Sequence, residues 1–280
     1  MHPLDFLWIF FILVSLQPAL QKRLLQGARR RLIARIEADR KSRVILLMHR
    51  QETLSFLGLP FMRYIDINDS EEVLRVLDAT PPEMPVDVVL HTPGGLVLAS
   101  TQIARALHQR QGKTTVFVPH HAMSGGTMIA LAADEIVMTS HAVLGPVDPQ
   151  LGQCPAASLL RVVQQKPIAE ISDQTLILAD QAHKAIEQVR FTIHELLADK
   201  LPAEKANELA EMLSEGRWTH DFAITADVAK QFGLSVSTEM PPDIMLMMEL
   251  YPQPMQTQPT VEHLPTPHQT QPDRPAQRRP

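Results

Sequence analysis

The first hydrophobic feature of the chain is a nearly uncharged run from Leu4 to Leu20, about 17 residues long. A helix of roughly 20 apolar residues spans a bilayer, so this run has the length of a short transmembrane segment. A cleaved signal peptide would carry positive charges ahead of its apolar run, and no Lys or Arg precedes Leu4. The pattern therefore favours an uncleaved transmembrane anchor over residues 1–21.

A basic stretch follows at residues 22–43. Its positive side chains are Lys22, Arg23, Arg29, Arg30, Arg31, Arg35, Arg40, Lys41 and Arg43. The positive-inside rule places such an excess in the cytoplasm, which predicts a single-pass protein with its body on the cytoplasmic side. The apolar positions recur at helical spacing (Leu24, Leu25, Leu32, Ile33 and Ile36), so we expect a basic juxtamembrane helix. Its polar face is either simply solvated or bound to an anionic membrane surface.

From Val44 onward, short apolar runs alternate with segments of helical spacing. The expected strands are 44–49, 86–92, 114–120 and 135–140, and the expected helices are 71–80, 96–110 and 126–134. Such alternation is typical of an α/β fold in which helices cover a sheet.

Beyond Gly145 the chain is expected to be rich in loops until a long amphipathic helix from about Asp173 to Asp199. A helical hairpin and a strand at 234–236 complete a domain that we place at residues 44–250. Residues 251–280 are dominated by Pro, Gln, Thr and charged residues, which predicts a disordered tail.

Composition removes several classes of function. The 280 residues carry a net charge of −5, so no basic surface of the kind that binds nucleic acid is expected. Cys154 is the one cysteine, which rules out an intrachain disulfide and a thiolate metal cluster built from this chain alone. No histidine pair has the spacing of a helical zinc site.

Two glycine-containing turns carry the candidate chemistry: HTPGG at 91–95, and Ser124 followed by Gly125 and Gly126. Each comes between an expected strand and an expected helix. A helix N-terminus offers unpaired N–H groups and a positive dipole end, which stabilise an attacking alkoxide and an oxyanion. Glycines let this backbone approach a substrate carbonyl closely. Taken singly, each motif fits an ordinary tight turn or a helix N-cap serine; together they indicate acyl-transfer chemistry with a serine nucleophile.

The combination resembles the serine dehydrogenase proteinase family, relatives of signal peptide peptidase A within the Clp/crotonase superfamily. The resemblance rests on DVVLHTPGGLVLAS (87–100), AMSGGTMIALAADEIVM (122–138), LGPVDPQLG (144–152) and GRWTH (216–220). It implies a Clp/crotonase-like α/β domain. It also implies an ATP-independent serine peptidase that needs no metal, nucleotide or organic cofactor.

Carried over onto this sequence, the resemblance makes Ser124 the nucleophile and the N–H groups of Gly94 and Gly125 the oxyanion donors. Clp-type peptidases place a histidine in the turn after the next strand, where this chain has Val147 and Asp148 between two prolines, and His141 comes too early. A Ser-His-Asp triad is therefore not expected. Asp148 could hold a carboxylate beside the active site, but a structural turn aspartate is favoured. One of the histidines near the glycine turns (His91, His120 and His121) could contact substrate or act as base, but a structural role at a strand end is favoured for each.

Relatives of signal peptide peptidase A use a lysine as general base, which suits a chain without that histidine. A lysine can do this only where burial or positive charge lowers its pKa toward neutrality. The resemblance points to Lys184 in the long helix or to Lys166 in the loop before it, and the choice stays open. Without such a role, Lys184 would be an exposed helix lysine paired with Asp180. The other lysines downstream of the serine are Lys200, Lys205 and Lys230.

The predicted function is hydrolysis of peptide bonds in membrane-associated substrates by a membrane-anchored homo-oligomer with a Ser-Lys dyad. A hydratase or isomerase acting on acyl-CoA would need no serine at position 124. The remaining alternative is a catalytically silent scaffold of the same fold that binds a partner protein.

Overall fold

The computed structural model describes residues 3–49 and 63–251, and its centre is a sheet of five parallel strands. In spatial order these are β1 (Arg43–Met48), β2 (Val86–His91), β3 (Thr114–Val118), β5 (Glu135–Met138) and β10 (Val236–Ser237). Every residue of β2 is buried, as expected for a central strand covered on both faces. The predicted strands and the α/β class are confirmed.

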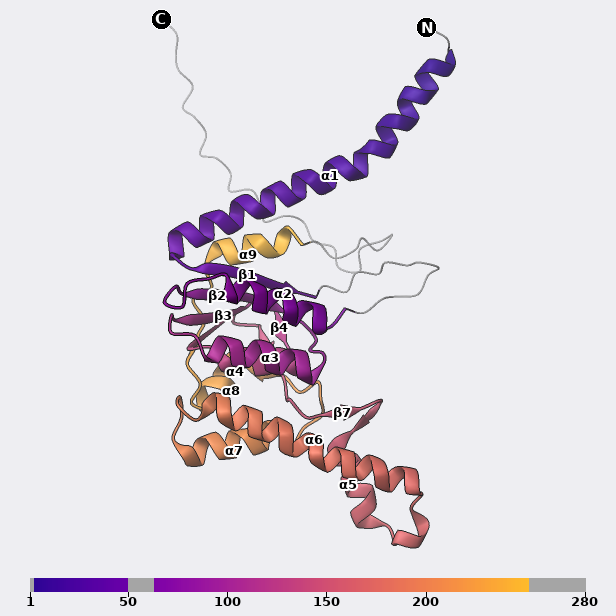
Figure 1. Cartoon of the computed structure of the whole chain (residues 1–280), viewed down its shortest axis with the longest axis vertical. Helices are drawn as coiled ribbons and strands as arrows, with labels where there is room; N and C mark the ends of the chain where they lie inside the picture. Colours follow the sequence, from indigo (N-terminus) through magenta and orange to yellow (C-terminus); the bar gives the residue numbers. More distant parts are fainter. Residues whose placement is uncertain (1–2, 50–62, 252–280) are drawn as a thin grey trace, which may run out of the picture.

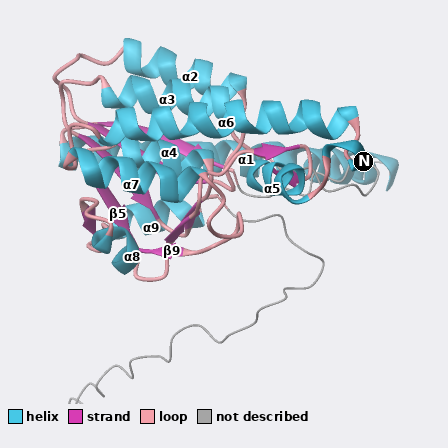
Figure 2. Cartoon of the chain, turned by 90° about the horizontal axis from the view of Figure 1, so that it is seen from below, coloured by secondary structure: helices cyan, strands magenta, loops and turns pink. Residues whose placement is uncertain are grey.

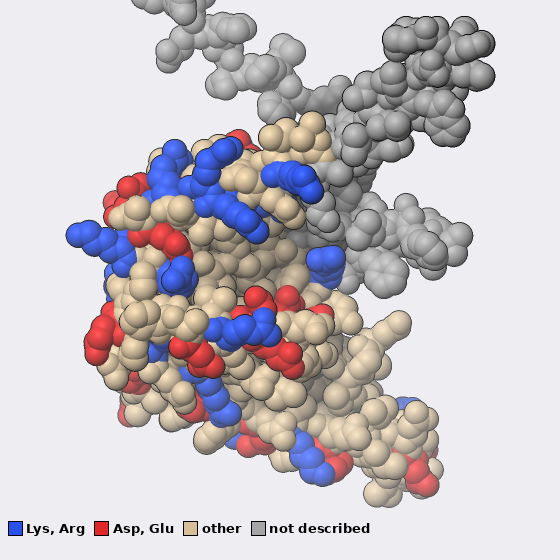
Figure 3. Space-filling view, turned by 45° about the horizontal axis from the view of Figure 1, so that its top comes forward, with Lys and Arg blue, Asp and Glu red and all other residues tan. Residues whose placement is uncertain are grey.

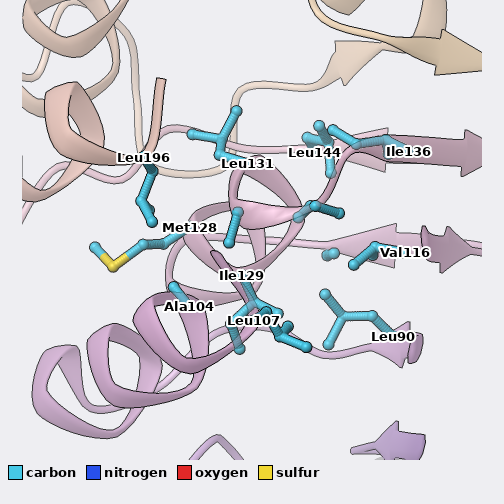
Figure 4. Close-up of a cluster of buried hydrophobic side chains, with 14 of the residues drawn as sticks. Leu90, Ala104, Leu107, Val116, Met128, Ile129, Leu131, Ile136, Leu144 and Leu196 are labelled. Atoms are coloured by element: carbon cyan, nitrogen blue, oxygen red, sulfur yellow. The ribbon is translucent and has the colours of Figure 1, made fainter. Parts of the chain in front are cut away.

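Helices cover both faces of this sheet (Figure 1). One face carries α2 (Ile67–Asp78), α3 (Val97–His108) and α4 (Gly125–Ala132), and the other carries the end of α1 (Pro3–Arg40) and α9 (Pro242–Glu249). A further layer consists of α6 (Asp173–Leu197), which contacts α3 and α4, and α7 (Ala203–Ser214), which packs against α6 (Figure 2). The main apolar core lies between the sheet and α2, α3, α4 and α6. Figure 4 shows the part of it that α3, α4 and α6 cover.

A second core joins α1 and α9 to the opposite face of the sheet. Leu32 and Ile36 of α1 are buried there against Val89, Phe117 and residues of α9. This part of the apolar stripe predicted for residues 22–43 therefore packs on the protein itself. Lys and Arg side chains lie on the outer face in the region of α1 (Figure 3).

Smaller elements shape the region after the main sheet. β4 (His121–Ala122), β6 (Val143–Leu144) and β9 (Ile224–Thr225) form a three-stranded sheet, and β7 (Gln150–Leu151) pairs with β8 (Cys154–Pro155). α8 (Ala226–Gln231) follows β9. The expectation of loops from Gly145 to the long helix is wrong in part: α5 (Ala156–Gln165) and a short 3₁₀ helix, η1 (Ile168–Glu170), lie there.

α5 forms because it has an apolar side that the long helix covers. Ala156, Leu159 and Leu160 pack with Ala182 and Ile186 of α6. The resulting α5–α6 hairpin projects from the body of the molecule, with the connection at 166–172 at its tip (Figure 1).

Two predicted segments lie largely outside the described residues. The side chains of the predicted anchor lie outside them, apart from Leu20, although its backbone from Pro3 continues as α1. Among the described residues no helix has the length and apolar character needed to cross a membrane. The predicted tail also lies outside the described residues, apart from Tyr251.

Candidate active site

Ser124 lies at the junction of β4 and α4, in a backbone conformation that L-residues rarely adopt. Its φ is 52° and its ψ is −117°, and of the described residues other than glycine only Lys41 also has a positive φ. Its side chain makes no capping hydrogen bond within the described part of α4. Ser124 is therefore not an ordinary N-cap serine. Strain of this kind persists where the surroundings enforce it, and it is frequent at active sites.

The HTPGG turn reaches Ser124 because the chain beyond β2 pairs with β4. Thr92 N donates to His121 O at 3.2 Å, and Met123 N donates to Thr92 O at 3.0 Å. Gly94, with φ of 109°, then lies directly against the serine: a Cβ built on it would stand 2.7 Å from Ser124 Cβ. The two motifs that the sequence singled out therefore meet in one place.

The backbone donors around Ser124 differ in availability. Gly94 N–H donates to Thr92 Oγ1 at 3.1 Å, so it is already engaged. No hydrogen bond between described residues uses the N–H of Gly95 or of Gly125. These two groups are near neighbours, since a Cβ built on Gly125 would stand 3.6 Å from Gly95 N. The oxyanion role of Gly94 stays a prediction, and Gly95 N–H is a donor that the sequence argument did not select.

Position 125 has no room for a side chain because α3 lies directly against it. A Cβ there would stand 2.1 Å from Ser100 Oγ, a fully buried hydroxyl that has no hydrogen-bond partner among the described residues. On its other side α4 is held by Thr127, whose Oγ1 donates to Ala122 O at 2.8 Å and accepts from Gly145 N at 2.9 Å. The N-terminus of α4 is thus fixed between the HTPGG turn, α3 and β6.

The two candidate base lysines both lie on the α5–α6 hairpin and are exposed. Lys184 pairs with Asp180 one turn earlier, and its side chain is 65% exposed. Lys166 is the residue that ends α5. Within the described chain neither lysine hydrogen bonds to Ser124, so the structure of one chain does not assemble the predicted dyad.

Lys200, just beyond the end of α6, is a partly buried lysine whose pKa is lowered. Burial lowers this pKa below its usual value, although the charges of Asp199 and Asp134 act in the opposite direction. Its Nζ donates to Leu131 O at 2.8 Å and to Ala133 O at 2.9 Å. These carbonyls end α4, about 12 Å along the helix from Ser124 at its start. Lys200 therefore caps the helix and does not contact the serine.

The structure also pairs Asp148 with His220, which the sequence argument missed. Asp148 is buried, and its carboxylate accepts from Gln150 Nε2 at 2.7 Å and contacts His220 Nδ1 at 2.8 Å. The pairing extends the antiparallel register of β6 and β9, in which Leu144 faces Ile224. Both residues lie in the motifs LGPVDPQLG and GRWTH, whose joint presence was the available signal.

Three histidines gather where β2 and β3 end. The ring centroids of His91 and His121 are 4.2 Å apart, and those of His91 and His120 are 5.6 Å apart. Burial and the neighbouring His120 lower the pKa of His121, which favours its neutral form.

The chain resembles known proteins over nearly its whole length. Residues 2–277 match the family described as ClpP-like SDH-type serine proteinase. The uncharacterized protein MJ0137 of Methanocaldococcus jannaschii is 51% identical over 260 residues, which are 93% of this chain and 91% of that protein. The uncharacterized protein MJ1495 of the same organism is 49% identical over 263 residues, covering 94% and 90%. The probable protease SohB of Haemophilus influenzae is 40% identical over 81 residues, covering 28% and 23%.

Two solved structures of a membrane-bound stomatin-specific protease are more distant. One mutant is 19% identical with a TM-score of 0.45, covering 73% of this chain and 82% of that chain. The other, in complex with a substrate peptide, is 20% identical with a TM-score of 0.44, covering 70% and 75%.

The family match includes both glycine turns, Ser124, the α5–α6 hairpin and the Asp148–His220 pair. It confirms the resemblance to the serine dehydrogenase proteinases and the α/β Clp-like protease fold. The chain belongs to the ClpP-like SDH-type serine proteinases.

Proposed function

We propose that this protein is a serine endopeptidase that cleaves peptide bonds through an acyl-enzyme formed on Ser124. The observation that carries the proposal is the position of this serine. It lies at the N-terminus of α4 in a strained conformation, with Gly94 against its side chain. A turn of this kind presents a hydroxyl beside free backbone donors, which is what acyl transfer requires.

The proposed reaction has two halves. Ser124 Oγ attacks the substrate carbonyl carbon and gives its proton to a general base. The resulting oxyanion accepts hydrogen bonds from the N–H of Gly125 and from that of Gly95, which takes the place of the predicted donor Gly94 because the Gly94 N–H is bound to Thr92. The C–N bond then breaks, and the leaving amine takes the proton from the base. Water repeats the sequence on the ester, which releases the acid product and restores the serine hydroxyl.

The general base is proposed to be a lysine on the α5–α6 hairpin, Lys184 or Lys166. Both side chains are exposed in the single chain. A lysine becomes a base when it is buried, and a second copy packed against the hairpin would bury it. We therefore propose a homo-oligomer in which the base meets the serine of the same copy or of a neighbouring one.

Membrane attachment through residues 1–21, with the catalytic domain in the cytoplasm, is part of the proposal and rests on the sequence. The supporting features are the uncharged run from Leu4 to Leu20 and the basic residues that follow it. The substrates are then membrane-associated proteins or peptides. Retention of the full chain in the membrane fraction after carbonate extraction, with release of a chain lacking residues 1–21, tests the anchor.

The test of the enzymatic proposal is hydrolysis of casein or a fluorogenic peptide by the detergent-solubilised protein. Ser124→Ala should abolish turnover, and one of Lys184→Ala and Lys166→Ala should do the same. Loss in His220→Ala with both lysine variants active would transfer the base role to the Asp148–His220 pair. Activity that survives Ser124→Ala, or a correctly assembled wild-type protein without activity, would favour the silent scaffold.

A further inference from the structure

A buried histidine, His49, lies behind the HTPGG turn. It directly follows β1, and 6% of its surface is exposed. Both ring nitrogens have partners: Nδ1 lies 2.9 Å from Thr92 Oγ1, and Nε2 lies 3.1 Å from Asp69 Oδ2. Thr92 is fully buried, and its Oγ1 accepts the N–H of Gly94 at 3.1 Å. An unbroken set of hydrogen bonds thus runs from Asp69 through His49 and Thr92 to Gly94.

The chemistry of these groups fixes the direction of the bond between His49 and Asp69. Burial raises the pKa of Asp69, but hydrogen bonds from His49 and from Asp66 N–H outweigh it and leave the pKa below its usual value. The ionised carboxylate can only accept, so His49 Nε2–H donates to it. In a neutral ring Nδ1 then accepts the Thr92 hydroxyl. In a charged ring Nδ1–H donates to Thr92 Oγ1, and the hydroxyl hydrogen goes to Gly94 O, which lies 3.3 Å from Oγ1. In either case a lone pair of Thr92 Oγ1 remains for Gly94 N–H.

These bonds hold two consecutive peptide planes, Pro93–Gly94 and Gly94–Gly95. Thr92 holds the N–H of Gly94, and on the other side Ile65 N donates to Gly94 O at 2.8 Å. The same glycine contacts Ser124, and the next N–H along the chain is that of Gly95. A small rotation of this turn would move both Gly94, which contacts Ser124, and the N–H of Gly95.

Asp69, at the far end of this set of hydrogen bonds, is held in place by α2. Asp69 is the third residue of α2, and its carboxylate also accepts Asp66 N at 2.9 Å in a reciprocal capping box. Because α2 is packed on the main core, Asp69 cannot follow the turn if the turn shifts. His49 therefore links the HTPGG turn to α2 through its two ring hydrogen bonds.

We propose that His49 is a positioning residue for catalysis, which through Thr92 holds Gly94 and the adjacent Gly95 N–H in the geometry that accepts the oxyanion. This role rests on the proposed peptidase function. It differs from a role in packing alone because it depends on Nδ1, the atom that meets Thr92, more than on Nε2.

Two variants of the same residue separate these atoms. The amide of Asn reaches the place of Nδ1, so His49→Asn keeps an acceptor for Thr92 and loses Asp69. The longer amide of Gln reaches the place of Nε2, so His49→Gln keeps Asp69 and loses Thr92. Both exchange a buried ring for a neutral amide, so their effects on overall stability should be similar.

The expected result is a difference in kcat. Removal of one oxyanion donor typically costs 10²- to 10³-fold, so His49→Gln should lower kcat about 100-fold with KM changed less than about threefold. His49→Asn should lower kcat less than about tenfold. Equal losses in the two variants, or losses that follow their melting temperatures, would overturn the proposal.

Hydrogen exchange of a peptide that contains residues 92–96 gives a measurement independent of activity. His49→Gln should accelerate exchange in this peptide, and His49→Asn should leave it near the wild-type rate. Equal exchange in the two variants counts against the positioning role. If no Ser124-dependent hydrolysis exists, the peptidase proposal fails by itself, and the exchange difference still shows that His49 holds the turn.

Discussion

Gly94 lies in direct contact with Ser124, closely enough that no side chain fits between them. A Cβ built on Gly94 would stand 2.7 Å from Ser124 Cβ, 3.3 Å from Ser124 Oγ and 3.0 Å from Met123 O. Its φ of 109° also belongs to a region that L-residues rarely adopt. The glycine is therefore required twice, by the conformation of its own backbone and by the nucleophile beside it.

Gly94→Ala should therefore abolish peptide hydrolysis while the protein remains folded. The methyl group must displace Ser124 or the turn, and either movement disrupts the site. Gly152→Ala is a matched control, because Gly152 also has a positive φ, of 64°, but no atom within 4 Å of the added Cβ. Both should lower the unfolding free energy by about 1–3 kcal/mol through backbone strain, and only Gly94→Ala should remove activity. Full activity in Gly94→Ala would contradict the assigned site.

The strained backbone at Ser124 predicts that the serine needed for activity makes the folded protein less stable than a glycine at this position would. Glycine adopts a φ of 52° without strain, whereas alanine keeps the strain of the serine. Both Ser124→Gly and Ser124→Ala should be inactive. Ser124→Gly should nevertheless unfold at a higher temperature than Ser124→Ala, by an amount equivalent to about 1 kcal/mol. Equal melting temperatures would show that the residue carries no strain.

The sequence predicted the parts of the site that are encoded locally. Ser124 and Gly94 each stand in a turn between a strand and a helix, and the buried strands of the parallel sheet were clear from their apolar runs. His49 and His220 were not identified as parts of the site, because their partners come from distant segments. Thr92 is 43 residues after His49, and Asp148 is 72 residues before His220. Such pairs depend on strand order and register, which periodicity does not reveal.

The layer formed by α1 and α9 shows a similar limit. The apolar stripe of α1 was recognised, but a stripe alone does not say whether a membrane or a protein surface covers it. α9 went unpredicted because it has only eight residues, although Pro242 at its start is a known helix signal. The burial of Leu32 and Ile36 depends on both α9 and the sheet, and so could not be derived from one segment.

Lys200→Met should destabilise the protein in a pH-dependent way. The variant leaves the carbonyls of Leu131 and Ala133 without their donor, which typically costs about 1–3 kcal/mol. Because burial lowers the pKa of Lys200 below 10.5, the folded state binds fewer protons than the unfolded state between the lowered value and 10.5. Stability therefore rises with pH across that window.

The measurement is denaturant unfolding of the wild type and Lys200→Met at pH 7 and at pH 10. The advantage of the wild type should be larger at pH 10, since the neutral amine no longer incurs the cost of a buried charge. Lys205→Met, on the exposed side of α7, should change stability by less than about 0.5 kcal/mol at both values. A wild-type advantage that shrinks as pH rises would contradict the lowered pKa.

Arg40→Met should destabilise the attachment of α1 to the sheet. Asp87, the second residue of β2, is 1% exposed. Arg40 binds both of its carboxylate oxygens, and Ser42 Oγ donates to one of them at 2.6 Å. Removing one partner of a buried ion pair costs about 3–5 kcal/mol, because the remaining charge is left uncompensated. For a domain of this size that corresponds to roughly 6–20 °C in melting temperature.

The arginine at 43 provides the control for this prediction, because its ion pair with Glu37 is more exposed. The side chains of Arg43 and Glu37 are 39% and 24% exposed, so Arg43→Met should cost less than about 1 kcal/mol. The double variant Arg40→Met with Asp87→Leu should recover most of the loss, since it removes the buried charge together with its partner. If Arg40→Met melts like the wild type, the ion pair does not hold α1 on the sheet, and the packing of Leu32 and Ile36 alone must do so.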